Sequence, residues 1–208
     1  MDLVIPGLYA TAPQPLPFAP SLAMRAFLCQ REGGNLLVYG TSGLEGEAPA
    51  IERLGGVARR YLNHGHEAEF VSAAPASPIF VHEDDSEAVD GSRPFSGRHT
   101  LGDDFEVIPT PGHTPGATAY LWRTGEHRVL FTGDTIYLSE GDWVAAVLES
   151  SDRESYAASL ELIRELDFDV LAPWIATGGQ PSHAATDATD ARRRIDTILE
   201  RVRKGASR

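Results

Sequence analysis

Cysteine and basic residues are scarce in this chain of 208 residues. Cys29 is the only cysteine, so no internal disulfide can form, and a zinc site built from cysteines is excluded. Lysine and arginine number 18 against 30 acidic residues, which gives a net charge of −12. This balance argues against nucleic acids and anionic membranes as partners, because both attract clustered positive charge.

The sequence also lacks the segments typical of membrane insertion and export. No stretch approaches the roughly 18 consecutive apolar residues that a membrane span requires. The first residues, M-D-L-V-I-P, show neither the basic start nor the long apolar run of a signal peptide. Hydrophobic residues make up 42% of the chain, enough for a sizeable core. We therefore expect a soluble, cytoplasmic protein in which residues 1–208 form one domain.

Several motifs of common enzyme classes are missing as well. Neither G-x-G-x-x-G nor G-x-x-x-x-G-K-[ST] occurs, so these nucleotide-binding loops have no support. The stretch G-T-S-G at 40–43 falls one residue short of the nucleophile elbow G-x-S-x-G. Cys29 lies within an apolar run, where a cysteine is usually a packing residue. Covalent catalysis by serine or cysteine is therefore a poor hypothesis for this chain.

Short apolar runs between turn residues predict many strands, with helices mainly toward the C-terminus. Strands are predicted over 3–10, 22–29, 35–39, 60–63, 78–82, 105–109, 117–122, 128–131 and 169–174. Helices are predicted over 48–55, 152–166 and 183–204, the second capped by Ser151 or Asp152. Prolines at 13, 15, 17 and 20 predict no regular structure across 11–20. Strands interleaved with helices indicate a layered α/β or α+β protein.

Three histidines and an aspartate follow predicted strands and form the candidate site. His64 and His66 flank a glycine after the run at 60–63, and an i, i+2 pair in an extended turn can point both rings at one metal. His113 lies in a rigid turn with two prolines and two glycines, and Asp134 follows the run at 128–131. Three imidazoles and one carboxylate suit zinc, and iron or manganese with lower preference.

These motifs resemble those of the metallo-β-lactamase superfamily along nearly the whole chain. H-G-H at 64–66 matches the first half of the family motif H-x-H-x-D-H, and T-P-G-H-T-P-G at 110–116 matches P-G-H-T-P-G. F-T-G-D-T at 131–135 matches the motif whose aspartate bridges two metals in that family. The resemblance implies an α+β fold, a four-layer αββα sandwich with two mixed sheets face to face and the metal site at one edge.

The chain departs from the family pattern where a second metal would bind. The family aspartate is replaced by Ala68, which has no donor atom, and the family histidine by Glu69, which could still ligate. The family's last histidine is missing from 172–179, and His183, a few residues beyond, is not expected to replace it. We therefore predict His64, His66, His113, Asp134 and Glu69 as metal ligands, with a second metal site that is weak or empty.

Four other side chains near these motifs could have either a structural or a functional role. The stretch H-E-D-D at 82–85 resembles a branch of the superfamily in which H-x-H-x-D-H is eroded. His82 is expected to cap its strand, although His82 or Glu83 could replace a missing ligand. Glu67 is expected to be solvated on a first helical turn, where a negative charge suits the helix dipole. Glu69 is as well placed to face solvent as to face the metal.

The resemblance implies a metal-dependent hydrolase that acts on a small ester, thioester or lactone. Asp134 would then be the catalytic residue, because it can orient or deprotonate a water activated by the metal. The alternative is a catalytically inactive member with a binding role, which kept the fold and lost the chemistry. The expected partner is a small-molecule substrate. A homodimer is favoured only because two-fold assemblies are common.

Overall fold

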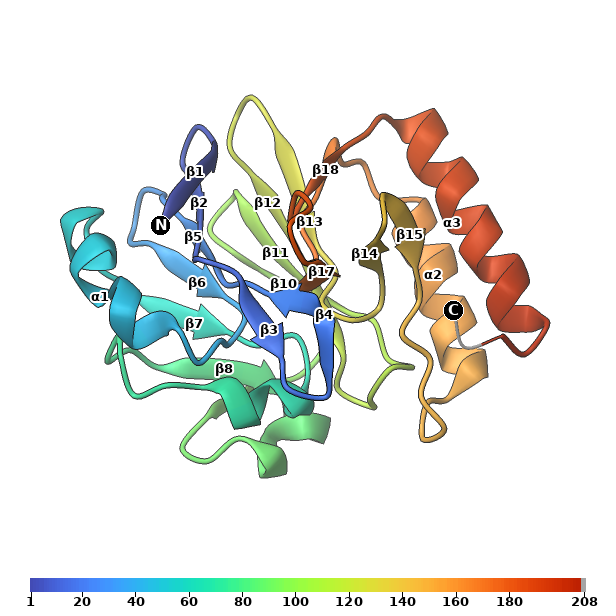
Figure 1. The fold of residues 1–208 in the computed structure, drawn as a ribbon, viewed down its shortest axis with the longest axis horizontal. Helices are drawn as coiled ribbons and strands as arrows, with labels where there is room; N and C mark the ends of the chain where they lie inside the picture. The colour runs from blue at the N-terminus through green and yellow to red at the C-terminus, as the bar shows by residue number, and fades with distance from the viewer. Residues whose placement is uncertain (207–208) are drawn as a thin grey trace.

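The computed structural model describes residues 1–206 and places β-sheets between flanking helices (Figure 1). Helix α1 (Leu44–Arg53) lies on one flank, and α2 (Arg153–Arg164) and α3 (Ala188–Arg203) cover the other. Two 3-10 helices, η1 (Gly65–Phe70) and η2 (Glu83–Ala88), follow strands at the sheet edge. The α+β class and the helix–sheet–sheet–helix layering expected from the motifs are confirmed.

Hydrogen bonds group the strands into three sheets rather than the two that we expected. The first contains, in spatial order, β1 (Asp2–Ile5), β2 (Leu8–Ala10), β5 (Phe27–Cys29), β6 (Leu36–Val38), β7 (Arg59–Tyr61), β8 (Ile79–His82) and β9 (Arg93–Phe95). The second contains β10 (His99–Leu101), β11 (Phe105–Pro109), β12 (Thr118–Arg123), β13 (Arg128–Phe131), β16 (Val170–Leu171) and β18 (Ala184–Ala185). The third contains β15 (Asp142–Val144), β14 (Tyr137–Ser139), β17 (Ile175–Thr177), β4 (Ala19–Met24) and β3 (Gln14–Leu16).

The direction of the strands explains why residues distant in sequence meet at one edge. Strands β6, β7, β8 and β9 run parallel to one another. The carboxyl ends of parallel strands lie at the same edge of a sheet. The segments that leave β7 and β8, which are η1 and η2, are therefore neighbours. This placement brings the histidine pair at 64–66 close to the acidic stretch at 82–85.

Two buried layers hold the sheets and helices together. The rings of Phe27, Tyr39 and Phe131 pack between the first two sheets, with centroids 5.8 to 6.1 Å apart. On the other side, the apolar face of α2 packs with α3 against the second sheet. That layer contains the helical positions expected from the sequence, namely Tyr156, Leu160, Ile163, Ile195, Ile198, Leu199 and Val202. Cys29 is fully buried in the first layer, as a packing residue.

Several predicted elements are confirmed and others are shifted. The antiparallel pair β5–β6 lies within the strands predicted at 22–29 and 35–39, and Asp152 caps α2 through its side chain. The prediction of irregular structure over 11–20 is wrong, because β3 and the start of β4 lie there. Pro15 is tolerated because β3 is an edge strand, where a missing N–H leaves no ladder bond unmade.

The helices differ from the predictions mainly in where they begin. Helix α3 begins at Ala188 rather than at 183, because Asp187 accepts hydrogen bonds from the backbone N–H groups of Thr189 and Asp190 and acts as the N-cap. Helix α1 begins at Leu44, four residues before the predicted start. No helix in residues 1–206 is long and apolar enough to cross a membrane.

Candidate metal centre

The three histidines expected to bind metal meet at one edge of the sandwich. His64 and His66 leave β7 at the start of η1, and His113 lies in the loop after β11. One ring nitrogen of each lies within 4.8 Å of one from each of the others. Oδ2 of Asp134, in the loop after β13, is 3.6 Å from Nε2 of His64 and 3.6 Å from Nε2 of His113. The structure therefore brings together four of the five predicted ligands.

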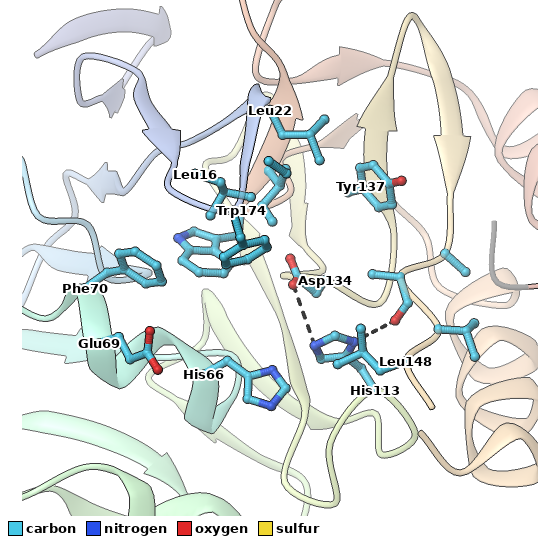
Figure 2. A pocket seen from close by; sticks show the side chains of 16 residues that line it. Leu16, Leu22, His66, Glu69, Phe70, His113, Asp134, Tyr137, Leu148 and Trp174 are labelled. Carbon is cyan, nitrogen blue, oxygen red and sulfur yellow. Dashed lines mark hydrogen bonds and ion pairs between the residues drawn. The ribbon is translucent and has the colours of Figure 1, made fainter. Parts of the chain in front are cut away.

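Several polar atoms of this cluster are buried without a hydrogen-bond partner. They are Nδ1 and Nε2 of His64, Nε2 of His113 and Oδ1 of Asp134. Buried polar atoms are nearly always paired in proteins, and a cluster of unpaired ones calls for an ion or a water. Nδ1 of His113 lies 2.7 Å from the carbonyl oxygen of Ala146, which favours the tautomer with a lone pair on Nε2 (Figure 2). The donor set fits a divalent metal.

Burial sets the charge of the cluster. It lowers the pKa of His64 to about 3 and lowers the pKa values of His66 and His113. All three rings are thus neutral near pH 7, the form in which imidazole binds a metal. Burial also raises the pKa of Asp134 to about 6, partly opposed by His64. At neutral pH the cluster offers three neutral nitrogens and one carboxylate.

Glu67 lies beneath the histidines, and our expectation that it is solvated is wrong. Its side chain is fully buried and accepts hydrogen bonds of 2.6 Å from the backbone N–H groups of Gly40 and Asn63. Oε1 is 3.3 Å from Nδ1 of His64. The tight 3-10 turn of η1 directs this side chain inward, toward backbone donors that need an acceptor. Burial raises the pKa of Glu67 to about 8, opposed by these backbone donors.

Asp85 joins the two loops that carry the histidines. Its carboxylate accepts hydrogen bonds from the backbone N–H of Gly65 at 2.8 Å, from the Thr114 hydroxyl at 2.6 Å and from the backbone N–H of Gly116 at 3.1 Å. A Cβ atom at Gly116 would lie 2.7 Å from that carboxyl group. Glycine at this position therefore allows the carboxylate to approach. The motif H-E-D-D at 82–85 predicts no role for Asp85.

Tyr39 supports the loop that carries Asp134. It has a φ of 76°, a conformation that is uncommon for a residue other than glycine. Its hydroxyl donates to the carbonyl of Ala172 at 2.8 Å and accepts from the backbone N–H of Gly133 at 2.9 Å. The strained backbone of Tyr39 thus directs a buried hydroxyl to the residue before Asp134.

The other candidate residues lie apart from the cluster or at its margin. His82 ends β8 and, rather than capping the strand, caps η2, since its Nδ1 accepts from the backbone N–H of Asp84 at 3.3 Å; Glu83 is exposed. Glu69 is exposed at the edge of the adjacent cavity, near His66 (Figure 2). His183 does not line that cavity. Within residues 1–206, the three histidines are the only group of three or more metal-binding side chains close enough to share an ion.

Trp174 packs against one of the three histidines. Its ring lies 5.3 Å from the ring of His64, centroid to centroid, and its indole N–H donates to the carbonyl of Gly40 at 2.8 Å. Ala68 contributes no donor atom. The weak or empty second site stays a prediction.

A cavity of about 550 Å³ opens beside the cluster (Figure 2). Four residues form what we call its polar wall: His66, Glu69, His113 and Asp134. The other twelve form its apolar wall: Leu16, Phe18, Ala19, Leu22, Phe70, Tyr137, Ala145, Ala146, Val147, Leu148, Trp174 and Ile175. The volume lies in the range of sites that bind small molecules.

Comparison with known proteins agrees with this geometry. The model of the Metallo-beta-lactamase superfamily matches residues 42–173, a span that contains all three histidines and Asp134. The chain belongs to the metallo-beta-lactamase superfamily. No curated protein matches the chain.

Solved structures of metallo-beta-lactamases share the fold at low sequence identity. A metallo-beta-lactamase family protein from Thermus thermophilus is 20% identical, with 97% of this chain and 81% of that one covered and a TM-score of 0.67. A metallo-beta-lactamase from Pontibacter korlensis is 14% identical, with 96% of each chain covered and a TM-score of 0.71. The DIM-1 metallo-beta-lactamase is 14% identical, with 96% and 95% covered and a TM-score of 0.72. At these identities the likeness supports the fold and leaves the substrate open.

Proposed function

We propose that this protein is a metal-dependent hydrolase of small esters, thioesters or lactones, with one metal held by His64, His66, His113 and Asp134. The observation that carries the proposal is the set of unpaired donor atoms at the polar wall of a cavity of about 550 Å³. Zinc suits three imidazoles and one carboxylate best, with iron and manganese as alternatives. The proposal takes residues 1–208 as one domain.

The polar wall offers distinct roles to its residues. A bound divalent ion supplies Lewis-acid chemistry, which activates water and polarises a carbonyl group. Asp134 lines the cavity, and its Oδ2 lies 3.6 Å from Nε2 of His64 and of His113, so it can orient the attacking water and accept its proton. His113 is held by Ala146 and cannot turn away. Glu69 stands at the edge of the cavity, where it can act as an additional ligand or meet the leaving group.

The alternative function is a binding protein without catalysis. It is favoured by one observation, the packing of the Trp174 ring on His64, which places an apolar ring against a predicted ligand. A member of the family with one metal at most has fewer ligands to position a nucleophile. The same cavity would then hold a small molecule without converting it.

Metal content separates these functions at their first step. We expect elemental analysis of the purified protein to find about one zinc, iron or manganese per chain. The metal should be lost in a His64→Ala/His113→Ala variant and kept in His99→Ala, a matched change to a histidine outside the cluster. Two metals per chain would show that Glu69 or another residue has rebuilt the second site.

An activity screen completes the test. We expect the loaded enzyme to hydrolyse at least one of 4-nitrophenyl acetate, a simple acyl thioester and a lactone, and Asp134→Asn to reduce that rate about 100-fold or more. No metal after loading with excess zinc, or metal without hydrolysis of any of the three classes, would overturn the hydrolase proposal.

A further inference from the structure

The apolar wall extends well beyond the residues that would bind the metal. Twelve of the sixteen lining residues are apolar. They come from two opposite segments, the β3–β4 hairpin with Leu16 and Leu22, and the segment after β15 with Val147 and Leu148 (Figure 2). Trp174 lies beside Leu16, and Leu148 lies beside His113 (Figure 2). A molecule whose reacting group lies at Asp134 would therefore place the rest of its length against hydrocarbon.

The rim of the cavity is apolar as well. Three large apolar side chains are notably exposed within residues 1–206, and two of them, Phe18 and Leu148, line this cavity. Phe18 is 78% exposed and Leu148 is 41% exposed. Isolated exposed apolar residues are ordinary, but a pair at the mouth of an apolar cavity marks a ligand surface. A ligand that covers both side chains would remove this surface from water.

The cavity also lacks a positively charged side chain. Among its lining residues, all within the described chain, there is no lysine or arginine. The carboxylates of Glu69 and Asp134 would balance the two charges of a divalent ion. The chain as a whole carries a net charge of −12. A carboxylate, phosphate or sulfate elsewhere on a substrate would therefore find no partner and would enter a negative field.

We infer that the substrate is an uncharged ester, thioester or lactone that carries an apolar acyl or alkyl group, which lies along the apolar wall. This inference rests on the proposed function. In the reaction, the water oxygen bonds to the carbonyl carbon, and the bond from that carbon to the ester oxygen or thioester sulfur breaks. One proton of the water ends on the leaving alcohol or thiol, and the other is released as the acid product ionises.

A series of 4-nitrophenyl esters tests chain length and charge separately. We expect kcat/KM to rise about threefold for each methylene group added from acetate through butanoate to octanoate, because each added group is buried in large part. The matched ester of octanedioic acid, which ends in a carboxylate, should be at least about tenfold poorer than octanoate. Equal rates along the series, or a preference for the charged ester, would overturn the inference while the hydrolase proposal stands.

Two variants at the rim test whether the apolar wall causes the preference for the long, uncharged ester. Phe18→Lys and Leu148→Lys alter exposed side chains, so we expect both proteins to fold. Each should lower the preference for octanoate over its carboxylate-tipped analogue by about tenfold, because a cation now faces the charged end. Leu3→Lys is the control, since Leu3 is 64% exposed and lies outside the cavity. An equal change in Leu3→Lys, or no change in either rim variant, would contradict the assignment.

Binding gives an answer that does not depend on hydrolysis. We expect isothermal titration calorimetry to show 2-nonanone binding at least about tenfold more tightly than 2-butanone, and Phe18→Lys to reduce that ratio. If no ester of the series, no thioester and no lactone is hydrolysed, the proposed function fails. The ratio of the affinities for the two ketones then tests by itself whether the apolar wall binds an apolar group. Equal affinities would overturn that inference.

Discussion

The two walls of the cavity are built in opposite ways. Behind the polar wall, buried carboxylates and a buried hydroxyl bind backbone groups from several loops: Glu67 under His64, Asp85 between the histidine loops, and Tyr39 beside Gly133. The apolar wall includes Phe18 and Leu148, which are exposed on a hairpin and a loop. One wall is held by directed hydrogen bonds and the other by contact between hydrocarbon surfaces.

This difference separates chemistry from selectivity. Metal ligands must keep a fixed geometry, so each is held by partners whose loss leaves a buried group unpaired. An apolar wall needs volume and surface, which many side chains can supply. Substitutions behind the polar wall should therefore affect stability and metal affinity together. Substitutions at the rim should affect the choice of ligand and leave stability nearly unchanged.

The largest effect is expected from Glu67→Ala. The N–H groups of Gly40 and Asn63 would lose their acceptor where water does not reach, so the free energy of unfolding should fall by roughly 2–5 kcal/mol. Chemical denaturation measures this value, with elemental analysis to follow the metal. Glu69→Ala is the matched control, an exposed glutamate two residues away, and should change stability by less than about 0.5 kcal/mol. Equal losses of stability in both variants would contradict the structural role of the buried Glu67.

A smaller effect is expected from Asp85→Asn. The amide keeps one accepting oxygen for Gly65 and Thr114, and its NH₂ group cannot accept from the N–H of Gly116. We expect a loss of roughly 1–3 kcal/mol in stability and a drop of about 10- to 100-fold in metal affinity. Titration of the metal-free protein with zinc measures the affinity. The control is Glu87→Gln, at an exposed acid of the same 3-10 helix, which should bind zinc as the unaltered protein does.

The smallest effect is expected at a carboxylate outside the cavity. Asp104 receives hydrogen bonds from Arg31 at 2.8 Å and from Trp122 at 3.3 Å, and Arg31 lowers its pKa. Because the folded-state pKa is the lower one, the pair stabilises the protein above the unfolded-state pKa of about 3.9. That stabilisation is lost as the pH falls through the folded-state value.

Asp104→Asn should therefore cost at most about 1 kcal/mol at pH 7, since solvent screens the pair. The cost should shrink below about pH 4. Urea denaturation of both proteins at pH 7 and pH 3.5 measures it. If Asp104→Asn lost as much stability as Glu67→Ala, the two kinds of carboxylate would not differ. One kind is held by buried backbone groups and the other by a cation in a partly exposed pair.

Much of the fold and of the ligand set could be predicted from short stretches of sequence. The strands β11 and β13 lie over the predicted residues, and the histidines follow β7 and β11 as predicted. At Gly112, which has a φ of 139°, a Cβ atom would meet the backbone of Tyr156. Such local requirements are visible in residue types. The sequence does not predict the hairpin at 14–24, because its prolines are typical of irregular structure. An edge strand nevertheless tolerates proline.

Local residue types placed the three histidines and Asp134 after predicted strands, and the family resemblance marked the missing ligand at Ala68. The tertiary structure alone decided the direction of Glu67, the reach of Asp85 to Gly65 and Gly116, and the composition of the apolar wall. Residues 16–22, 145–148 and 174 are distant in sequence, and no local pattern states that they share a cavity. They meet because β3, β4, β15 and β17 belong to the same sheet, and which strands share a sheet is a property of the whole fold.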